Sequence, residues 1–159
     1  MEEDNKRVIA FLNSITNVSI KNFEDRLRLQ KLVFLARKMG LDFGFSFSWY
    51  ARGPYSPSLT RVLFSADELG LLECKDIQPS ENEKKVAKNI KQFLGNDVEN
   101  PRYLELLASV WYFINEKEIS EDENKEILNT LLELKPQFTK DELEQAIKRI
   151  ISWKRTNIL

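Results

Sequence analysis

The sequence predicts a mainly α protein of six to seven helices with a minor two-stranded β element. Three observations predict this class. Apolar residues recur every three to four positions along most of the chain, which is the period of a helix. Residues 43–49 alternate instead with the period of a strand. Capping residues and glycines stand where the helical periods begin and end.

The chain has 159 residues, which is the size of one domain. We expect a single domain over 1–159, in which residues 1–78 form a unit of helix, strand, turn and helix and residues 79–159 form a helical cap. Segment 76–80 is the expected hinge between them. No apolar run approaches the roughly 18 residues that cross a bilayer. The first residues also lack the pattern of an export signal, so the sequence favours a cytoplasmic protein without a membrane partner.

Composition excludes most catalytic chemistry. The chain has no histidine, which removes Ser-His and Cys-His nucleophiles and the zinc sites built on histidine. Cys74 is the single cysteine, and beside the apolar Leu71 and Leu72 it is expected to be an inert, partly buried thiol. We therefore expect a non-enzymatic protein with no cofactor and no metal site. Carboxylate or lysine chemistry is the remaining route to an enzyme.

Two helices are expected before the strand. Residues 5–13 predict a short amphipathic helix, and residues 23–39 predict a longer one that Gly40 ends. The apolar residues of the longer helix fall into two stripes, so we expect it to be covered on more than one side. Its cations lie in two sectors between those stripes: Arg26, Arg28, Lys31, Arg37 and Lys38.

Segment 43–49 carries an aromatic residue at every odd position and a small residue at every even one. This pattern predicts a strand with one buried face, which could pair with a second short strand at 71–77. Its large side chains are expected in the core, because burying one contributes about 2 kcal/mol. A stacking platform for single-stranded nucleic acid is the alternative. The aromatic residues are Phe43, Phe45, Phe47 and Trp49.

A turn follows at Gly53-Pro54. Ser56 is expected to cap the next helix, Pro57 to occupy its first turn and Gly70 to end it. The functional alternative is a recognition loop that presents Arg52 and Tyr55, since loops carry function disproportionately. The two interpretations are compatible.

The second half is marked by repeated helix starts. The pairs Ser80/Glu83, Ser120/Glu123 and Thr139/Glu142 fit the capping box, in which a hydroxyl and a carboxylate satisfy each other's backbone donors. Asn100-Pro101 opens a fourth helix. We expect this fourth helix to be central to the second half.

Two segments carry a family resemblance. They read Arg28-Leu29-Gln30-Lys31-Leu32-Val33-Phe34-Leu35-Ala36 and Trp49-Tyr50-Ala51-Arg52-Gly53-Pro54-Tyr55-Ser56. With the apolar residues up to Leu72, they resemble the YwgA-like family and its relatives in the antitoxin-associated Panacea group over about 45 residues. Arg52 departs from the aromatic or small residue that often precedes Gly-Pro in these families. The resemblance implies a winged-helix-like N-terminal half and, for the Panacea relatives, a protein that binds and neutralises a partner protein, often a toxin.

The leading hypothesis is a non-enzymatic, antitoxin-like regulatory protein that binds a partner protein. The alternative is a winged-helix DNA-binding regulator whose helix at 56–69 enters the major groove. Residues 21–61 hold eight Lys/Arg against three Asp/Glu, but the chain has a net charge of −1 and Asp67 and Glu68 share that helix. Nucleic acid is therefore the second choice of partner. The candidate partner-binding residues are Tyr50, Arg52, Gly53, Pro54, Tyr55, Ser56 and Arg61.

Overall fold

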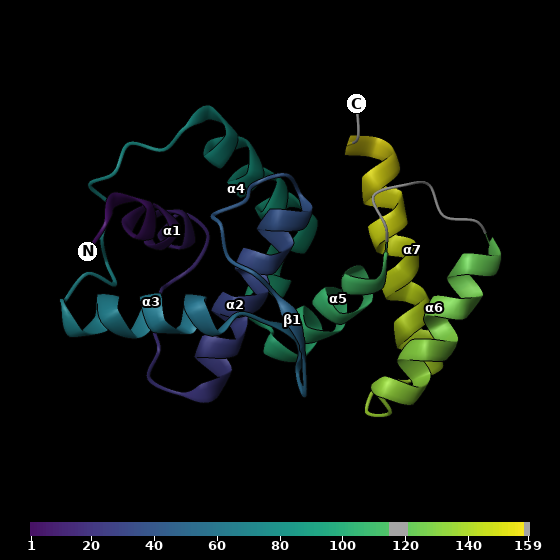
Figure 1. Ribbon diagram of the computed structural model, residues 1–159. Helices are drawn as coiled ribbons and strands as arrows, with labels where there is room; N and C mark the ends of the chain where they lie inside the picture. The colour runs from purple at the N-terminus through teal and green to yellow at the C-terminus, as the bar shows by residue number, and fades with distance from the viewer. Residues whose placement is uncertain (115–120, 158–159) are drawn as a thin grey trace. The chain divides into compact units, whose positions relative to one another are not determined.

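The computed structural model describes residues 1–114 and 121–157 (Figure 1). Over those residues it contains seven α-helices, one 3-10 helix and one two-stranded antiparallel sheet. This confirms a mainly α fold with a minor β element, while the winged-helix likeness stays a prediction. The elements are α1 (Glu3–Asn13), α2 (Phe23–Lys38), β1 (Ser48–Tyr50), β2 (Gly53–Tyr55), α3 (Pro57–Glu68), α4 (Glu81–Leu94), η1 (Gly95–Glu99), α5 (Pro101–Phe113), α6 (Glu121–Leu134) and α7 (Lys140–Asn157).

The chain groups into two compact units, Met1–Glu105 and Leu106–Leu159. The boundary between these contact units falls within α5, and α4 packs against α2 in the first unit. The hinge expected at 76–80 stays a prediction. None of the helices in the described part of the chain is both long enough and apolar enough to span a membrane.

Helix α2 is the centre of the first unit, because every side chain from Leu27 to Ala36 is buried. The prediction that this helix is covered on more than one side is thus confirmed. Asn22 caps the start by accepting from the Asp25 N–H at 2.8 Å. Gly40, with φ of 103°, ends the helix and lets the Leu41 N–H donate to the Ala36 carbonyl at 2.9 Å.

Burial also reaches two cations of α2. Arg28 is 6% exposed and Lys31 is fully buried. Arg28 donates to the Val98 carbonyl at 2.9 Å and to the Thr16 hydroxyl at 3.2 Å, and Lys31 donates to the Pro54 carbonyl of β2. The sequence placed both between the apolar stripes, but their long apolar stems allow them to cross the core to backbone acceptors.

The two-stranded element differs from the predicted one. Only Ser48–Tyr50 forms a strand, and its partner is Gly53–Tyr55, with Ser48 opposite Tyr55 and Tyr50 opposite Gly53. The expected partner at 71–77 is wrong, because that segment turns back on itself through a bond from the Cys74 N–H to the Leu71 carbonyl at 3.0 Å. Gly53 adopts a φ of 90°, which residues with a side chain rarely adopt, and this conformation allows the tight hairpin.

The aromatic segment before β1 keeps its predicted alternation without being a strand. Residues at its even positions are exposed and those at its odd positions are covered, with Phe45 buried. The ring of Phe43 lies 5.4 Å from that of Phe11, and the ring of Phe47 lies 5.3 Å from that of Phe34. These rings pack against α1 and α2, as the core interpretation predicted.

The helix starts of the second half follow the predicted capping signals. Ser80 and Glu83 exchange both bonds of a capping box, and so do Thr139 and Glu142. Asn100 accepts from the Tyr103 N–H at 3.1 Å at the start of α5. Ser120, the cap expected for α6, lies outside the described residues.

Within the second unit, Trp111 of α5 and Trp153 of α7 meet with ring centroids 5.6 Å apart. Trp111 is buried, and α5, α6 and α7 each contribute further buried apolar residues. The helix opened by Asn100-Pro101 therefore carries much of the buried surface of its unit, as expected. The buried residues include Leu107, Val110, Ile114, Leu131, Leu143, Ala146 and Ile150.

Candidate functional site

Gln30 of α2 binds the backbone at the point where the hairpin passes into α3. Its carbonyl oxygen accepts from the Ser56 N–H at 2.9 Å, and its amide nitrogen donates to the Ser56 carbonyl at 2.8 Å. The same nitrogen donates to the Thr60 hydroxyl at 2.9 Å. Gln30 is 2% exposed and Ser56 is fully buried, so these bonds satisfy polar groups that water does not reach.

Lys31, the next residue of α2, binds the hairpin itself. Its ammonium group donates to the Pro54 carbonyl at 2.6 Å from a fully buried position. A buried charge is costly unless it is hydrogen-bonded, so this contact holds β2 against α2 in one arrangement. Gln30 and Lys31 together fix the segment from Pro54 to Thr60.

These contacts give three of the predicted site residues a positioning role. Gly53, Pro54 and Ser56 are buried beneath the surface. Ser56 also caps α3, as predicted, by accepting from the Leu59 N–H at 3.3 Å. A partner in contact with this region would meet the neighbouring side chains instead.

Arg52 lies in the turn between β1 and β2 and is tied to two carboxylates. Its guanidinium forms ion pairs with Glu105 and, at 3.4 Å, with Glu24, and it lies 5.5 Å above the Phe23 ring. Burial lowers the pKa of Arg52, but hydrogen bonds and charge from Glu105 and Glu24 outweigh burial and raise the pKa above its ordinary value. The guanidinium is therefore permanently charged and held in place.

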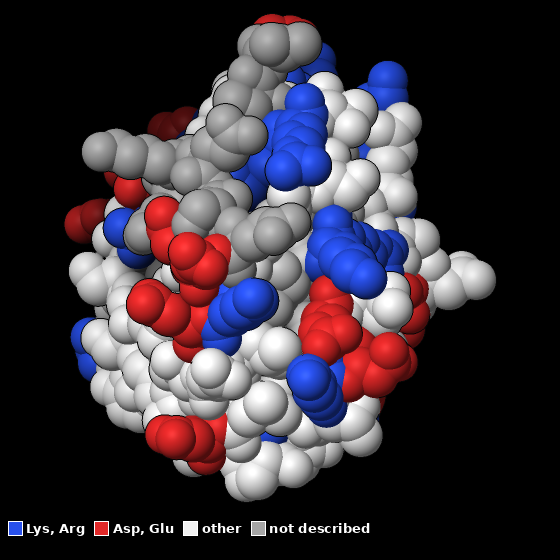
Figure 2. Space-filling view, turned by 90° about the vertical axis from the view of Figure 1, so that its right-hand side faces the viewer, with Lys and Arg blue, Asp and Glu red and all other residues white. Residues whose placement is uncertain are grey.

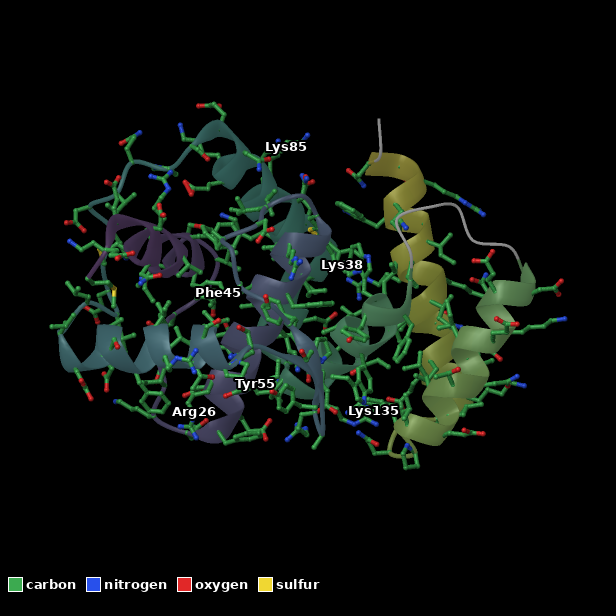
Figure 3. All side chains as sticks on the ribbon, viewed as in Figure 1. Arg26, Lys38, Phe45, Tyr55, Lys85 and Lys135 are labelled. Atoms are coloured by element: carbon green, nitrogen blue, oxygen red, sulfur yellow. The ribbon has the colours of Figure 1, made fainter. Side chains whose placement is uncertain are left out.

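A small cavity of about 250 Å³ opens beside the hairpin. Tyr50 and Tyr55 form one wall, with their rings 5.1 Å apart, and the Tyr55 hydroxyl is bonded to that of Thr60 at 2.6 Å. Figure 3 labels Tyr55 and Arg26, which both line this cavity. Phe23, the first residue of α2, and Arg52 also line the cavity.

Three large aromatic side chains are exposed around this cavity or next to it. Phe23 is 50% exposed, Tyr50 46% and Phe64 44%. The Arg26 guanidinium lies 6.0 Å from the Phe23 ring and 5.7 Å from the Phe64 ring, so it joins α2 to α3. We call this set the aromatic–arginine surface: Phe23, Arg26, Tyr50, Arg52, Tyr55 and Phe64.

Sequence reasoning placed Tyr50, Arg52 and Tyr55 in the site but missed Phe23, Arg26 and Phe64. A signal for two of them was present. Phe64 falls off the apolar stripe of its helix, and Phe23 directly follows the cap Asn22, where a large apolar residue is exposed on the first turn. Arg26 gave no comparable signal among the other cations of α2.

Arg61 lies on the exposed side of α3, outside the cavity. Helical spacing places it one turn from Phe64, at the edge of the aromatic–arginine surface. Asp67 and Glu68 are exposed on the same helix. Arg61 is therefore a candidate rim residue, and it is the predicted site residue that lies farthest along the chain from the hairpin.

Cys74 lies away from this surface. It is buried, and its thiol donates to the Asp76 carboxylate at 2.6 Å. That bond and, to a lesser extent, burial raise the pKa of the Cys74 thiol above its ordinary value. A raised pKa keeps the group as the less reactive thiol, which agrees with the inert role expected from the sequence.

Within residues 1–114 and 121–157, no cluster of three His, Cys, Asp or Glu is placed to hold a metal ion.

Comparison with known proteins finds one distant similarity. The chain is 27% identical over 143 residues to the uncharacterized protein YwgA of Bacillus subtilis (strain 168), which covers 79% of this chain and 84% of that protein. This similarity supports the resemblance to the YwgA-like family. No protein-family model matches the chain. No solved structure matches it either.

Proposed function

We propose that this protein is a small cytoplasmic, non-enzymatic regulator that binds a partner protein through the aromatic–arginine surface. The observation that carries the proposal is the exposure of Phe23, Tyr50 and Phe64 next to Arg26 and Arg52. Aromatic residues and arginine are the types that protein interfaces concentrate and that dominate their binding energy.

The supporting contacts favour a surface that is already ordered before binding. The hairpin is bonded to α2 through Lys31, and Arg52 is paired with Glu24 and Glu105. A surface held in this way loses less conformational entropy when it binds a partner. Tyrosine and phenylalanine add large contact area with few rotatable bonds.

The size of the cavity favours a protein partner over a small ligand. Its volume is about 250 Å³. Pockets for small molecules commonly span about 300–1,000 Å³. The cavity therefore suits one apolar side chain of a partner, with Tyr50 and Tyr55 along its wall and Arg52 at its edge.

The identity of the partner rests on the family resemblance. The sequence also resembles the antitoxin-associated Panacea group, whose members bind and neutralise partner proteins, so we propose an antitoxin-like role in which the partner is a toxin. The aromatic–arginine surface is then the part of this chain that contacts the toxin.

The structure offers less support for DNA binding than for protein binding. Arg28 and Lys31, two of the cations that could contact phosphates, are buried in the first unit. The exposed side of α3 carries Asp67 and Glu68 beside Arg61, which disfavours approach to phosphate. Figure 2 shows the side of the molecule at the right of Figure 1, where α6 and α7 lie, and both Lys/Arg and Asp/Glu side chains are present on it.

Co-purification from the native host tests the proposal. Tagged wild type is compared with Tyr50→Ala/Phe64→Ala, which truncates two exposed aromatics of the aromatic–arginine surface. The control is Leu69→Ala/Leu134→Ala, which truncates two exposed leucines that do not line the cavity. Leu69 is 58% exposed and Leu134 is 46% exposed.

We expect one stoichiometric protein to accompany wild type and control and to be lost with the aromatic variant. Retention of that protein by the aromatic variant would exclude this surface. A wild-type chain that stays alone while its gene neighbours are expressed would contradict partner binding altogether. If the partner is a toxin, co-expression with wild type should restore growth that the partner alone arrests.

A further inference from the structure

A second and larger hollow lies in the first unit, between α1 and α4. Its volume is about 630 Å³. The floor is apolar and contains Ala10, Phe11, Ile77 and Ala87. Cations line its sides, and we call the whole feature the lysine groove. Its cationic residues are Arg7, Lys75, Lys84, Lys88 and Lys91.

The long walls of the groove are stripes of two helices. From α1 come Arg7, Ala10 and Phe11, followed by its cap Ser14, and these residues are spaced by three and four positions. From α4 come Lys84, Ala87, Lys88 and Lys91, with the same spacing. Both helices pack on α2, and the small side chains of Ala10 and Ala87 leave room between them. Two helical stripes facing a common hollow form the kind of groove in which a third helix lies.

The third wall is the segment between α3 and α4, which runs past α1 (Figure 1). Asn13 of α1 donates to the Leu72 carbonyl at 2.8 Å, and Arg7 donates to the Gln78 carbonyl at 3.5 Å. These bonds hold the segment on α1, so the groove is preformed.

The charge of the groove is strongly one-sided. Five cations line it against one carboxylate, Glu83. Glu83 is already engaged, because it pairs with Arg7 at 3.0 Å and accepts from the Ser80 N–H at 2.8 Å. Lys84 pairs with Glu81 at 3.3 Å, which leaves Lys75, Lys88 and Lys91 as the groove cations without an ion pair to a described carboxylate. The net charge of the whole chain is −1, so this positive charge is local.

We infer that the lysine groove binds an acidic amphipathic helix of a partner protein. The apolar face of such a helix would cover Phe11, Ala87 and Ile77, and its acidic flanks would meet Lys88 and Lys91. A bare polyanion would leave the apolar floor uncovered, and an apolar helix would leave the lysines without counter-charges. The groove shares no lining residue with the cavity at the hairpin, so this inference is independent of the function proposed above.

The test uses a synthetic amphipathic peptide of about 18 residues, long enough for a five-turn helix, with leucine on one face and glutamate on its flanks. Binding is measured by calorimetry at low and physiological salt. We expect Lys88→Glu/Lys91→Glu to weaken binding about tenfold, because two attractive pairs become repulsive ones. Wild-type affinity should also fall as salt is raised.

The control is Lys85→Glu/Lys148→Glu, which changes the net charge equally. Lys85 is exposed on α4, as Figure 3 shows, but does not line the groove, and Lys148 belongs to the second unit. We expect this control to weaken binding less than about twofold. A third variant, Ala10→Trp, fills the floor without changing charge and should also weaken binding.

Equal weakening by the two charge variants would overturn the inference, and so would equal affinity for a scrambled peptide of the same composition or no binding at millimolar peptide. Unchanged binding to Ala10→Trp would do so as well, because the contact would then be electrostatic only. Backbone amide shifts confined to α1, α4 and the 71–80 segment would place the peptide in the groove.

Discussion

The amide side chain of Gln30 bonds both the N–H and the carbonyl of Ser56, at 2.9 and 2.8 Å. Gln30 belongs to the helical segment of the family resemblance and Ser56 to the segment around Gly53-Pro54. The two segments are separated in sequence but form one physical unit in the first half of the chain. A second contact of this kind joins Lys31, the residue after Gln30, to Pro54, two residues before Ser56.

Replacing Gln30 should destabilise the protein strongly. Gln30→Leu keeps the size of the side chain but leaves the buried Ser56 N–H without its partner, which costs about 1–3 kcal/mol for the unsatisfied donor alone. We expect a loss of about 2–4 kcal/mol in the free energy of unfolding by urea once the bond to Thr60 is also lost. Gln92→Leu, at an exposed position, is the control. A loss below about 0.5 kcal/mol, the usual size of a surface effect, would show that the contact does not hold the hairpin.

Helix starts and ends could be predicted from the sequence because their signals are local. Ser80, Asn100 and Thr139 each accept from the backbone N–H three residues further on, so the residue types alone indicate the structure. The ends at Gly40 and Gly70 follow for the same reason, since both adopt positive φ.

The hairpin could not be predicted in the same way. Strand pairing depends on which segments meet in space, and the expected partner at 71–77 had an equally suitable composition. The buried positions of Arg28 and Lys31 were also hidden, because charged residues are mostly exposed. Their acceptors, among them Val98 and Pro54, lie far away in the sequence. Of the aromatic–arginine surface, Tyr50, Arg52 and Tyr55 were therefore singled out from the sequence, whereas Phe23, Arg26 and Phe64 were not. That these residues bind a partner stays a prediction.

Glu83 should contribute more to the free energy of unfolding than Ser80, its partner in the capping box of α4. Ser80→Ala removes one capping bond and should cost about 1 kcal/mol. Glu83→Ala removes a bond to the Ser80 N–H and the ion pair with Arg7, and Glu83 is only 6% exposed. We expect this second loss to be about 2–3 kcal/mol, because a largely buried pair is broken by deleting one partner. Urea unfolding of the two variants measures the difference, and equal losses would contradict the double role of Glu83.

Cys74 should react slowly with alkylating reagents in the folded protein. Its pKa is raised by the bond to Asp76 and by burial, so the thiolate is scarce at neutral pH. Alkylation by iodoacetamide at pH 8 should be at least about tenfold slower in native protein than in urea. Asp76→Asn replaces the carboxylate whose hydrogen bond raises the thiol pKa with a weaker, neutral acceptor and should speed the native reaction. A native rate equal to the unfolded rate, or no change in Asp76→Asn, would contradict this description.

The dissociation constant of the isolated partner for wild type and variants tests the central claim most directly. The account predicts that Tyr50→Ala/Phe64→Ala weakens binding about a hundredfold, since two aromatic anchors of a binding surface cost about 1–2 kcal/mol each. Leu69→Ala/Leu134→Ala should change it less than about threefold, as expected of residues outside the contact. Equal affinity of the aromatic variant and wild type, with both folded by circular dichroism, would contradict the proposal that this protein acts through the aromatic–arginine surface.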